Sequence, residues 1–249
     1  MTETIGNQSL PRPPLDRHVS LFLDLDGTLV DLIDRPDDVV ADPPLRALLE
    51  AVRHRLEGRL AIVSGRSLAQ LDRILGPVAA DVILSGSHGT EFRRDGVTHA
   101  PPRSAALDRA GKDMRLFAQD HEGVLLEEKS YGIGLHYRMA PAMGGAARAL
   151  AASLARTYDL FAQEGHDMVE LRPPGHDKGQ AIRYLMEAPP MAGQPPVFLG
   201  DDLTDETGFA VVAALGGHGV LVGAARPSAA AYRLCDPAHV RNWLKELSL

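Results

Sequence analysis

Short apolar runs that end in acidic, serine or glycine residues recur along this 249-residue chain. They occupy residues 19–23, 60–63, 82–84, 196–199 and 220–222. Runs this short and continuously apolar are typical of strands that are buried on both faces of a sheet. Helix-like segments separate them, and strand–helix alternation predicts a parallel sheet covered by helices on both sides. The predicted fold class is therefore α/β, with a Rossmann-like parallel-sheet core.

The segment after the first run shows the helix signals most clearly. Asp42 followed by Pro43 and Pro44 is typical of a helix start. Apolar residues then recur at helical spacing, at Leu45, Leu48, Leu49, Val52 and Leu56. Further helices are predicted at about residues 67–75, 178–186, 204–215 and 240–247.

The pattern changes between residues 104 and 172. This stretch predicts two helices and four strands, over residues 104–120, 124–128, 131–137, the segment after Pro141, 159–163 and 168–171. A β-rich stretch with two helices inside an alternating pattern predicts a small inserted α+β domain. The predicted core domain is residues 18–103 together with 173–249, the inserted domain is residues 104–172, and residues 1–17 form a flexible leader.

The net charge of −7 argues against nucleic acid or an anionic membrane surface as a partner. No stretch approaches the roughly 18 continuous apolar residues of a membrane-spanning helix. The polar N-terminal segment lacks the basic start and apolar run of a secretion signal. The single cysteine, Cys235, excludes an internal disulfide framework and fits a reducing compartment. We therefore expect a cytoplasmic protein.

Two of the apolar runs lead into acidic segments, Asp24-Leu25-Asp26-Gly27-Thr28 and Gly200-Asp201-Asp202-Leu203-Thr204-Asp205. The carboxyl ends of parallel strands lie at one edge of a sheet, where α/β folds bind ligands. Two like charges about 4 Å apart repel by roughly 4 kcal/mol at an effective dielectric near 20. Carboxylates gathered at this edge therefore favour a bound cation, and hard oxygen ligands without Cys or His indicate Mg²⁺.

Each of these segments has an ordinary alternative when it is taken alone. Asp24 and Asp26 could be a solvated strand end, and Ser64-Gly65-Arg66 could be a turn. Lys178 could be a solvated lysine at a helix start, and Thr204 could be a helix cap. Together, however, a serine, a lysine and carboxylates beside a cation can bind phosphate oxygens and attack phosphorus. The combination predicts hydrolysis of a phosphate ester.

The acidic segments, Ser64 and Lys178, in this order, resemble the motifs of the haloacid-dehalogenase-like hydrolases. The resemblance implies that Asp24 is the nucleophile and a Mg²⁺ ligand. Asp26 would be the general acid and base, with its backbone carbonyl on the metal. Asp201 would be the third protein ligand, with Asp202 and Asp205 supporting the metal shell.

The same resemblance implies that Ser64, Gly65 and Lys178 bind the phosphate. It also implies that the core is the superfamily's Rossmann-like hydrolase domain and that the inserted α+β domain is its cap.

Six segments spread over nearly the whole chain resemble a narrower group, the trehalose-phosphatase family. They are Ser64-Gly65-Arg66-Ser67, Gly86-Ser87-His88-Gly89-Thr90-Glu91, Glu127-Glu128-Lys129, His136-Tyr137-Arg138, Val169-Glu170-Leu171 and Gly200-Asp201-Asp202-Leu203-Thr204-Asp205-Glu206.

The narrower resemblance implies that Glu127, Lys129 and Glu170 contact sugar hydroxyls through charge-assisted hydrogen bonds. It also implies that Arg66, His88 and Arg138 belong to the substrate site. A plain exposed strand remains an alternative for the cap residues, and a structural salt bridge remains one for the two arginines.

One position departs from the family pattern. Asp177 precedes Lys178 where related sequences often carry a neutral polar residue. An acid there would either weaken phosphate binding or face solvent.

The predicted activity is Mg²⁺-dependent hydrolysis of trehalose 6-phosphate to trehalose and phosphate through an aspartyl-phosphate intermediate. The expected partner is this small sugar phosphate, with functional coupling to a trehalose-phosphate synthase. Three alternatives stay open: a phosphatase for sucrose or mannosylglycerate phosphate, a phosphomutase, and a sugar-phosphate sensor on a degenerate hydrolase scaffold.

Overall fold

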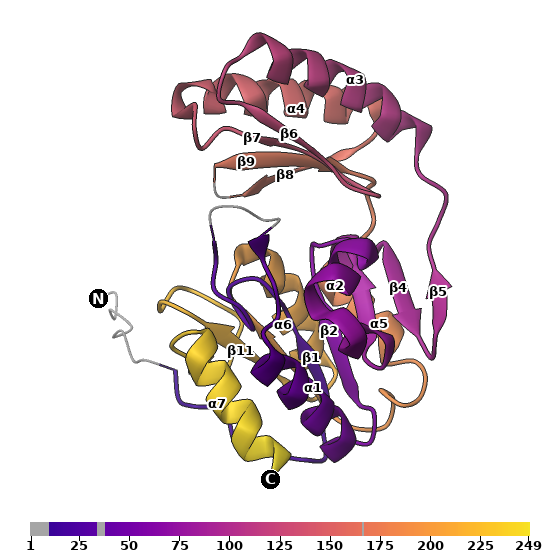
Figure 1. Ribbon diagram of the computed structural model, residues 1–249, viewed down its shortest axis with the longest axis vertical. Coiled ribbons are helices and arrows are strands. Elements are labelled where there is room, and N and C mark those ends of the chain that lie inside the picture. The colour runs from indigo at the N-terminus through magenta and orange to yellow at the C-terminus, as the bar shows by residue number, and fades with distance from the viewer. Residues whose placement is uncertain (1–9, 34–37, 166) are drawn as a thin grey trace, which may run out of the picture. The chain divides into compact units, whose positions relative to one another are not determined.

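The computed structural model describes residues 10–33, 38–165 and 167–249. The chain forms two compact units, the core unit (Met1–His99 with Asp177–Leu249) and the inserted unit (Ala100–His176) (Figure 1). The boundaries of the inserted unit thus lie four residues outside the predicted range of 104–172 at each end.

Within the described residues, the core unit contains an eight-stranded sheet of order β12-β11-β10-β1-β2-β3-β4-β5. Its parallel strands are β1 (Ser20–Leu23), β2 (Leu60–Val63), β3 (Ile83–Gly86), β10 (Pro196–Gly200), β11 (His218–Val222) and β12 (Tyr232–Leu234). At one edge, β4 (Glu91–Arg94) and β5 (Val97–His99) continue the sheet in antiparallel pairing. The prediction of an α/β fold with a mainly parallel sheet is confirmed.

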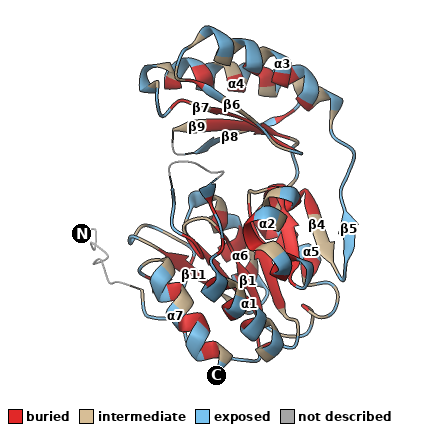
Figure 2. Ribbon diagram, in the orientation of Figure 1, coloured by how far each residue is buried: buried red, intermediate tan, exposed pale blue. Residues whose placement is uncertain are grey.

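The strands of this sheet are largely buried (Figure 2), and their side chains belong to two clusters shared with helices. Leu21 and Leu23 of β1 belong to a buried cluster with residues of α1 (Pro43–Arg55), α2 (Leu68–Leu75) and α7 (Pro237–Ser248). Phe22, between them, belongs to a second cluster with residues of α5 (Lys178–Leu185) and α6 (Glu206–Ala214). Since successive side chains of a strand point to opposite faces, the continuously apolar runs are explained by helices on both sides.

Three strands, β4, β5 and β12, were not predicted from the sequence, each for a local reason. The β4–β5 hairpin is charged, and all three residues of β5 are exposed, so no apolar run marks it. The third, β12, has only three residues.

The glycine-rich segment Gly216-Gly217-His218-Gly219 is partly strand, because β11 begins at His218. A side chain at Gly217 would lie 1.7 Å from the carbonyl oxygen of Pro196, so glycine permits the close approach to β10.

The leader predicted at residues 1–17 lies outside the described residues as far as residue 9. Beyond residue 9, the segment is bound to the rest of the core unit. The Arg233 backbone N–H donates to the Pro11 carbonyl (2.9 Å), and the Trp243 indole N–H donates to the Pro13 carbonyl (3.2 Å). The described part of the leader is therefore packed in place rather than free.

The inserted unit has a four-stranded antiparallel sheet in its described residues, of order β6-β7-β9-β8. These strands are β6 (Leu125–Glu128), β7 (Ile133–His136), β9 (Met168–Arg172) and β8 (Phe161–Gly165). Helices α3 (Ala105–Asp120) and α4 (Gly144–Tyr158) cover one face of it (Figure 1). Glu127, Gly134 and Glu170 are cross-strand partners on the other face, here called the open face.

No helix in the parts of the chain that the structure describes is long and apolar enough to cross a membrane.

The core makes a prediction at Phe198. Its side chain is fully buried in β10, and its ring centroid lies 5.4 Å from that of Phe209. Phe198→Ala should lower the free energy of unfolding by about 3–5 kcal/mol, measured by denaturant titration, because it removes buried area and leaves a cavity. Val97→Ala on the exposed β5 is the control and should change it by less than about 0.5 kcal/mol. A Phe198→Ala effect as small as the control would contradict the described packing.

Candidate active site

Residues that follow four parallel strands gather at the carboxyl edge of the core sheet. The Asp24 backbone N–H donates to the Leu199 carbonyl (2.9 Å), and the Ser64 N–H donates to the Ser85 carbonyl (2.9 Å). The strand ladder thus continues one residue beyond β1 and β2, which fixes Asp24 beside β10 and Ser64 beside β3. This edge is where a ligand was expected.

Lys178 connects two of the acidic residues. Its ammonium donates to Asp24 Oδ1 (2.8 Å) and to Asp205 Oδ1 (2.6 Å). All three side chains are buried, with 5% or less of each exposed. A buried charge without a partner is very costly, so each member depends on the others for its ionised form.

The structure shows what Asp177, the acid before Lys178, contacts. Asp177 is the N-cap of α5, and its carboxylate accepts a hydrogen bond from the Gln180 N–H (2.8 Å). The acid therefore stabilises the start of the helix that carries Lys178.

Three carboxylates form a cluster that fits a divalent cation. One oxygen each from Asp24, Asp201 and Asp205 lies within 4.8 Å of the others. The Lys178 ammonium balances only one of the three negative charges. Hard oxygen ligands with uncompensated negative charge are the donor set that divalent cations such as Mg²⁺ prefer.

The pKa values of these groups show the same excess of negative charge. Burial raises the pKa of Asp24 well above its ordinary value, and Asp205 and Asp201 add to this while Lys178 opposes it. Burial, together with Asp205, raises the pKa of Asp201 to about 7. Burial lowers the pKa of Lys178, but Asp205 and Asp24 outweigh it and raise the pKa on balance.

The turn at Gly27 makes room for the second acidic segment. Gly27 has a φ of 76°, and a side chain there would lie 2.1 Å from Asp201 Oδ2. Glycine is thus required both by the backbone conformation and by the approach of Asp201. The turn explains how acidic segments from two strands share one site.

Asp26 and Arg66 form a bidentate ion pair. Arg66 Nε donates to Asp26 Oδ2 (2.8 Å), and Arg66 Nη2 donates to Asp26 Oδ1 (2.6 Å). The Arg66 backbone N–H donates to Ser64 Oγ (3.1 Å). Asp26, the predicted general acid, therefore lies outside the carboxylate cluster. Arg66, which was expected to contact the substrate, is paired with Asp26 instead.

Gly65 and His88 pack against each other. A side chain at Gly65 would lie 2.7 Å from the His88 ring, and the His88 backbone N–H donates to the Ser64 carbonyl (3.1 Å). His88 is buried and has a left-handed backbone with φ of 56°. The structure therefore brings His88 to the loop expected to bind phosphate.

Asp202 and Asp205, predicted to act together, lie differently. Asp205 is fully buried and belongs to the carboxylate cluster. Asp202 is exposed, and its carboxylate accepts a hydrogen bond from the Leu203 N–H (2.6 Å). Its own N–H donates to Asp205 Oδ2 (2.9 Å), so Asp202 supports the cluster through its backbone.

Three predicted residues of the inserted unit come together on the open face of its sheet. Lys129 Nζ pairs with Glu170 Oε2 (2.5 Å) and lies 3.7 Å from Glu127 Oε2. His136 belongs to one of the family-like segments but was not among the predicted site residues, and its Nε2 lies 2.9 Å from the same Glu127 oxygen. Arg138 follows the end of β7 and pairs with Asp167 (3.9 Å). The first four side chains form a connected row of charged and polar groups.

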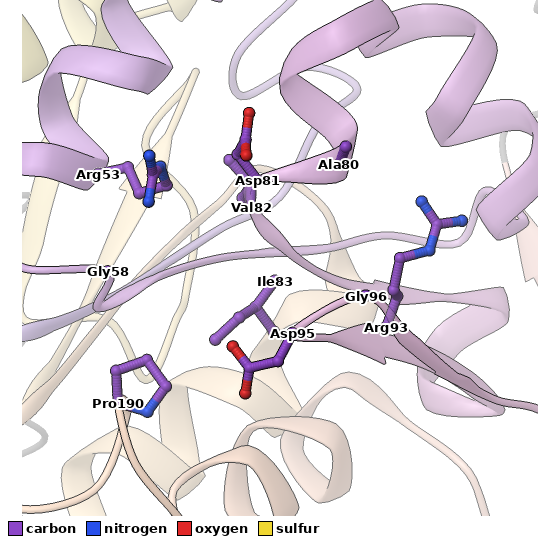
Figure 3. Close-up of a pocket in the computed structure, with 10 residues that line it drawn as sticks. All are labelled: Arg53, Gly58, Ala80, Asp81, Val82, Ile83, Arg93, Asp95, Gly96 and Pro190. Atoms are coloured by element: carbon purple, nitrogen blue, oxygen red, sulfur yellow. The ribbon is translucent and has the colours of Figure 1, made fainter.

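A separate cavity of about 260 Å³ lies at the other end of the core sheet (Figure 3). Its lining includes Gly58, before β2, and the β4–β5 turn at Asp95 and Gly96. The predicted site residues are not part of that lining.

The raised pKa of Asp201 predicts how metal-free stability depends on pH. A carboxyl whose pKa is higher in the folded chain than in the unfolded chain stabilises the fold at low pH, and this contribution is lost as pH rises from about 4 to about 7. Metal-free chain should therefore lose stability over this range relative to Asp201→Asn, measured as melting temperature. Added Mg²⁺ should restore stability increasingly towards pH 8, since it needs the ionised carboxylate. Parallel pH profiles for the two metal-free proteins would contradict this.

Comparisons with known proteins agree with this geometry. The chain matches the family model of the trehalose-phosphatases over residues 22–238. It is 39% identical over 241 residues to the trehalose-6-phosphate phosphatase of Escherichia coli (strain K12), covering 95% of this chain and 89% of that protein.

Two solved structures share the fold. One is the crystal structure of a trehalose-6-phosphate phosphatase related protein, with a TM-score of 0.79 and 28% identity over 92% of this chain and 96% of that one. The other is a haloacid dehalogenase-like hydrolase from Bacteroides thetaiotaomicron, with a TM-score of 0.66 and 16% identity over 91% and 98% of the two chains. The chain therefore belongs to the trehalose-phosphatase family, on the fold of the haloacid-dehalogenase-like hydrolases.

Proposed function

We propose that this chain hydrolyses trehalose 6-phosphate to trehalose and inorganic phosphate, with Mg²⁺ as its cation. The observation that carries the proposal is the cluster of Asp24, Asp201 and Asp205 around the Lys178 ammonium at the carboxyl edge of the sheet. Membership of the trehalose-phosphatase family supports a small sugar phosphate as substrate, and the name of the Escherichia coli relative supports trehalose 6-phosphate.

The proposed reaction begins with Asp24. Its carboxylate oxygen attacks phosphorus, the bond from phosphorus to the sugar oxygen breaks, and an aspartyl phosphate forms. Asp26 donates a proton to the departing sugar oxygen and then takes one from the water that hydrolyses the aspartyl phosphate. Ser64, the Gly65 amide and Lys178 bind the phosphate oxygens in the meantime.

Asp24 and Asp201 are the side chains that would hold Mg²⁺, together with the Asp26 backbone carbonyl, and Asp205 would join or support them. When bound, the cation reduces the repulsion between an anionic nucleophile and an anionic phosphate. Asp202 would support these metal ligands through the hydrogen bond from its backbone N–H to Asp205.

The proposed sugar contacts come from the open face of the inserted unit. Glu127, Lys129 and Glu170 offer acceptors and donors in one row, which suits a disaccharide with many hydroxyl groups. Arg138 of the inserted unit, and Arg66 and His88 of the core unit, are further residues that we propose contact the substrate. Arg66 would do so from its ion pair with Asp26.

We propose a cytoplasmic setting because the single cysteine fits a reducing compartment. A trehalose-phosphate synthase would supply the substrate there, so functional coupling to it is part of the proposal. The net charge of −7 disfavours nucleic acid and anionic membranes as partners.

The nucleophile is tested by Asp24→Asn. An amide can still accept the Lys178 hydrogen bond, so the fold should persist, but it cannot attack phosphorus. Phosphate release from trehalose 6-phosphate should fall by at least about 100-fold, with the melting temperature nearly unchanged. Retention of more than a few per cent of the wild-type rate in this folded variant would rule out Asp24 as nucleophile.

The sugar contacts are tested by Glu127→Gln and Glu170→Gln. Each loses a charge-assisted hydrogen bond, so kcat/KM for trehalose 6-phosphate should fall by roughly 10-fold or more, while kcat/KM for p-nitrophenyl phosphate stays within about threefold.

Glu128→Gln is the matched control for these variants. Glu128 neighbours Glu127 in β6 but points to the other face and pairs with Arg115 of α3. It should affect neither substrate. Equal losses for both substrates in Glu127→Gln and Glu170→Gln would remove the specificity role.

A further inference from the structure

Arg226 lies in the connection between β11 and β12, far along the chain from both acidic segments. Its Nη2 donates to the backbone carbonyl of Asp202 (2.8 Å) and reaches that of Asp201 (3.3 Å). Its side chain is 23% exposed. A single guanidinium thus binds two successive carbonyls of the segment that carries a predicted metal ligand.

Glu206 holds this arginine in place. Arg226 Nη1 forms an ion pair with Glu206 Oε1, and Glu206 Oε2 accepts a hydrogen bond from the Ala229 N–H (2.8 Å). Glu206 is the first residue of α6, directly after Asp205. Arg226 and Glu206 therefore join the connection after β11 to both ends of the segment from Asp201 to Glu206.

The segment needs such restraint because it is short and strongly acidic. Asp201, Asp202 and Asp205 repel one another. The carboxylates of Asp202 and Asp205 cap the turn at Leu203–Asp205, and Arg226 binds the two carbonyls that precede this turn. The direction of a backbone carbonyl follows the ψ angle of its residue. Hydrogen bonds to the Asp201 and Asp202 carbonyls therefore restrain the ψ angles of both residues. The Asp201 side chain then meets Gly27 on one side and the other two carboxylates of the cluster on the other.

We propose that Arg226 is a positioning residue for the cation site: through the Asp201 and Asp202 carbonyls it holds the Asp201 carboxylate towards Asp24 and so increases affinity for the divalent cation. It contacts neither the cation nor the substrate. This inference rests on the proposed function only in taking the carboxylate cluster as the cation site.

The sign of the effect separates positioning from simple electrostatics. Arg226 is positively charged and lies near the cluster, so its charge alone repels a cation. Removing that charge should strengthen cation binding if electrostatics dominates. Only a positioning role predicts that removal weakens it.

The test is Mg²⁺ binding to the full chain after removal of metal by a chelator, measured by titration calorimetry without substrate. Arg226→Gln should raise the Mg²⁺ dissociation constant by about 10-fold or more, within the range typical of residues that orient metal ligands. The Mg²⁺ concentration for half-maximal phosphate release should rise by the same factor. Arg226→Lys can reach only one carbonyl well and should give an intermediate value.

Arg233→Gln is the matched control. Arg233 also binds a backbone carbonyl in the core unit, since its Nε donates to the Gly223 carbonyl (2.7 Å). Gly223 lies outside the acidic segment. Its Mg²⁺ affinity should equal that of the wild type. Asp201→Asn is the reference for loss of the site and should bind Mg²⁺ far more weakly.

Wild-type or stronger Mg²⁺ affinity in Arg226→Gln would overturn the positioning role, as would equal weakening in Arg233→Gln. Wild-type affinity in Asp201→Asn would instead show that the cation site itself is misplaced, which is a failure of the proposed function.

Discussion

The site depends on the buried ammonium of Lys178 between the carboxylates of Asp24 and Asp205. Lys178 begins α5, Asp24 follows β1 and Asp205 precedes α6. The Lys178 ammonium therefore joins three elements at the carboxyl edge of the sheet. Its positive charge balances one of these two buried carboxylates, at a distance where charges interact by several kcal/mol. Asp201 adds a third carboxylate, so that the cluster carries more negative charge than Lys178 can balance. Such an excess of negative charge on hard oxygen ligands favours a divalent cation.

The sequence predicted the fold and the position of this cluster because both follow from chain direction. Continuously apolar runs identify strands buried on both faces, and the polar residue after each run must lie at the same edge. Asp24, Ser64 and Asp201 could be placed together in this way. Lys178 was predicted from its combination with the other segments and from the family resemblance, since a lysine at a helix start is ordinary when it is taken alone.

Other features depend on contacts that no sequence period encodes. Asp205 was expected to support the metal shell, and its contact with Lys178, made through the turn after β10, was not predicted. Arg66 pairs with Asp26, and Arg226 donates hydrogen bonds to two backbone carbonyls. Both arginines contact residues at least 24 positions away in the sequence. The β4–β5 hairpin was missed because three of the four residues of β4 are charged and all of β5 is exposed, so that no apolar run marks either strand.

The two units divide the chemistry between them. The core unit holds the groups proposed to attack, protonate and bind phosphate, while the row of His136, Glu127, Lys129 and Glu170 on the inserted unit offers contacts for hydroxyl groups. In the proposed function the core groups act on the phosphate, and selection of the sugar is assigned to the row on the inserted unit.

Phosphate release from a panel of sugar phosphates therefore tests the central claim most directly. With Mg²⁺ present, the account predicts the highest kcat/KM for trehalose 6-phosphate, above sucrose 6-phosphate, mannosylglycerate phosphate and glucose 6-phosphate, with free phosphate and no isomerised sugar phosphate. A higher value for another member of the panel, or conversion to an isomer without phosphate release, would contradict it.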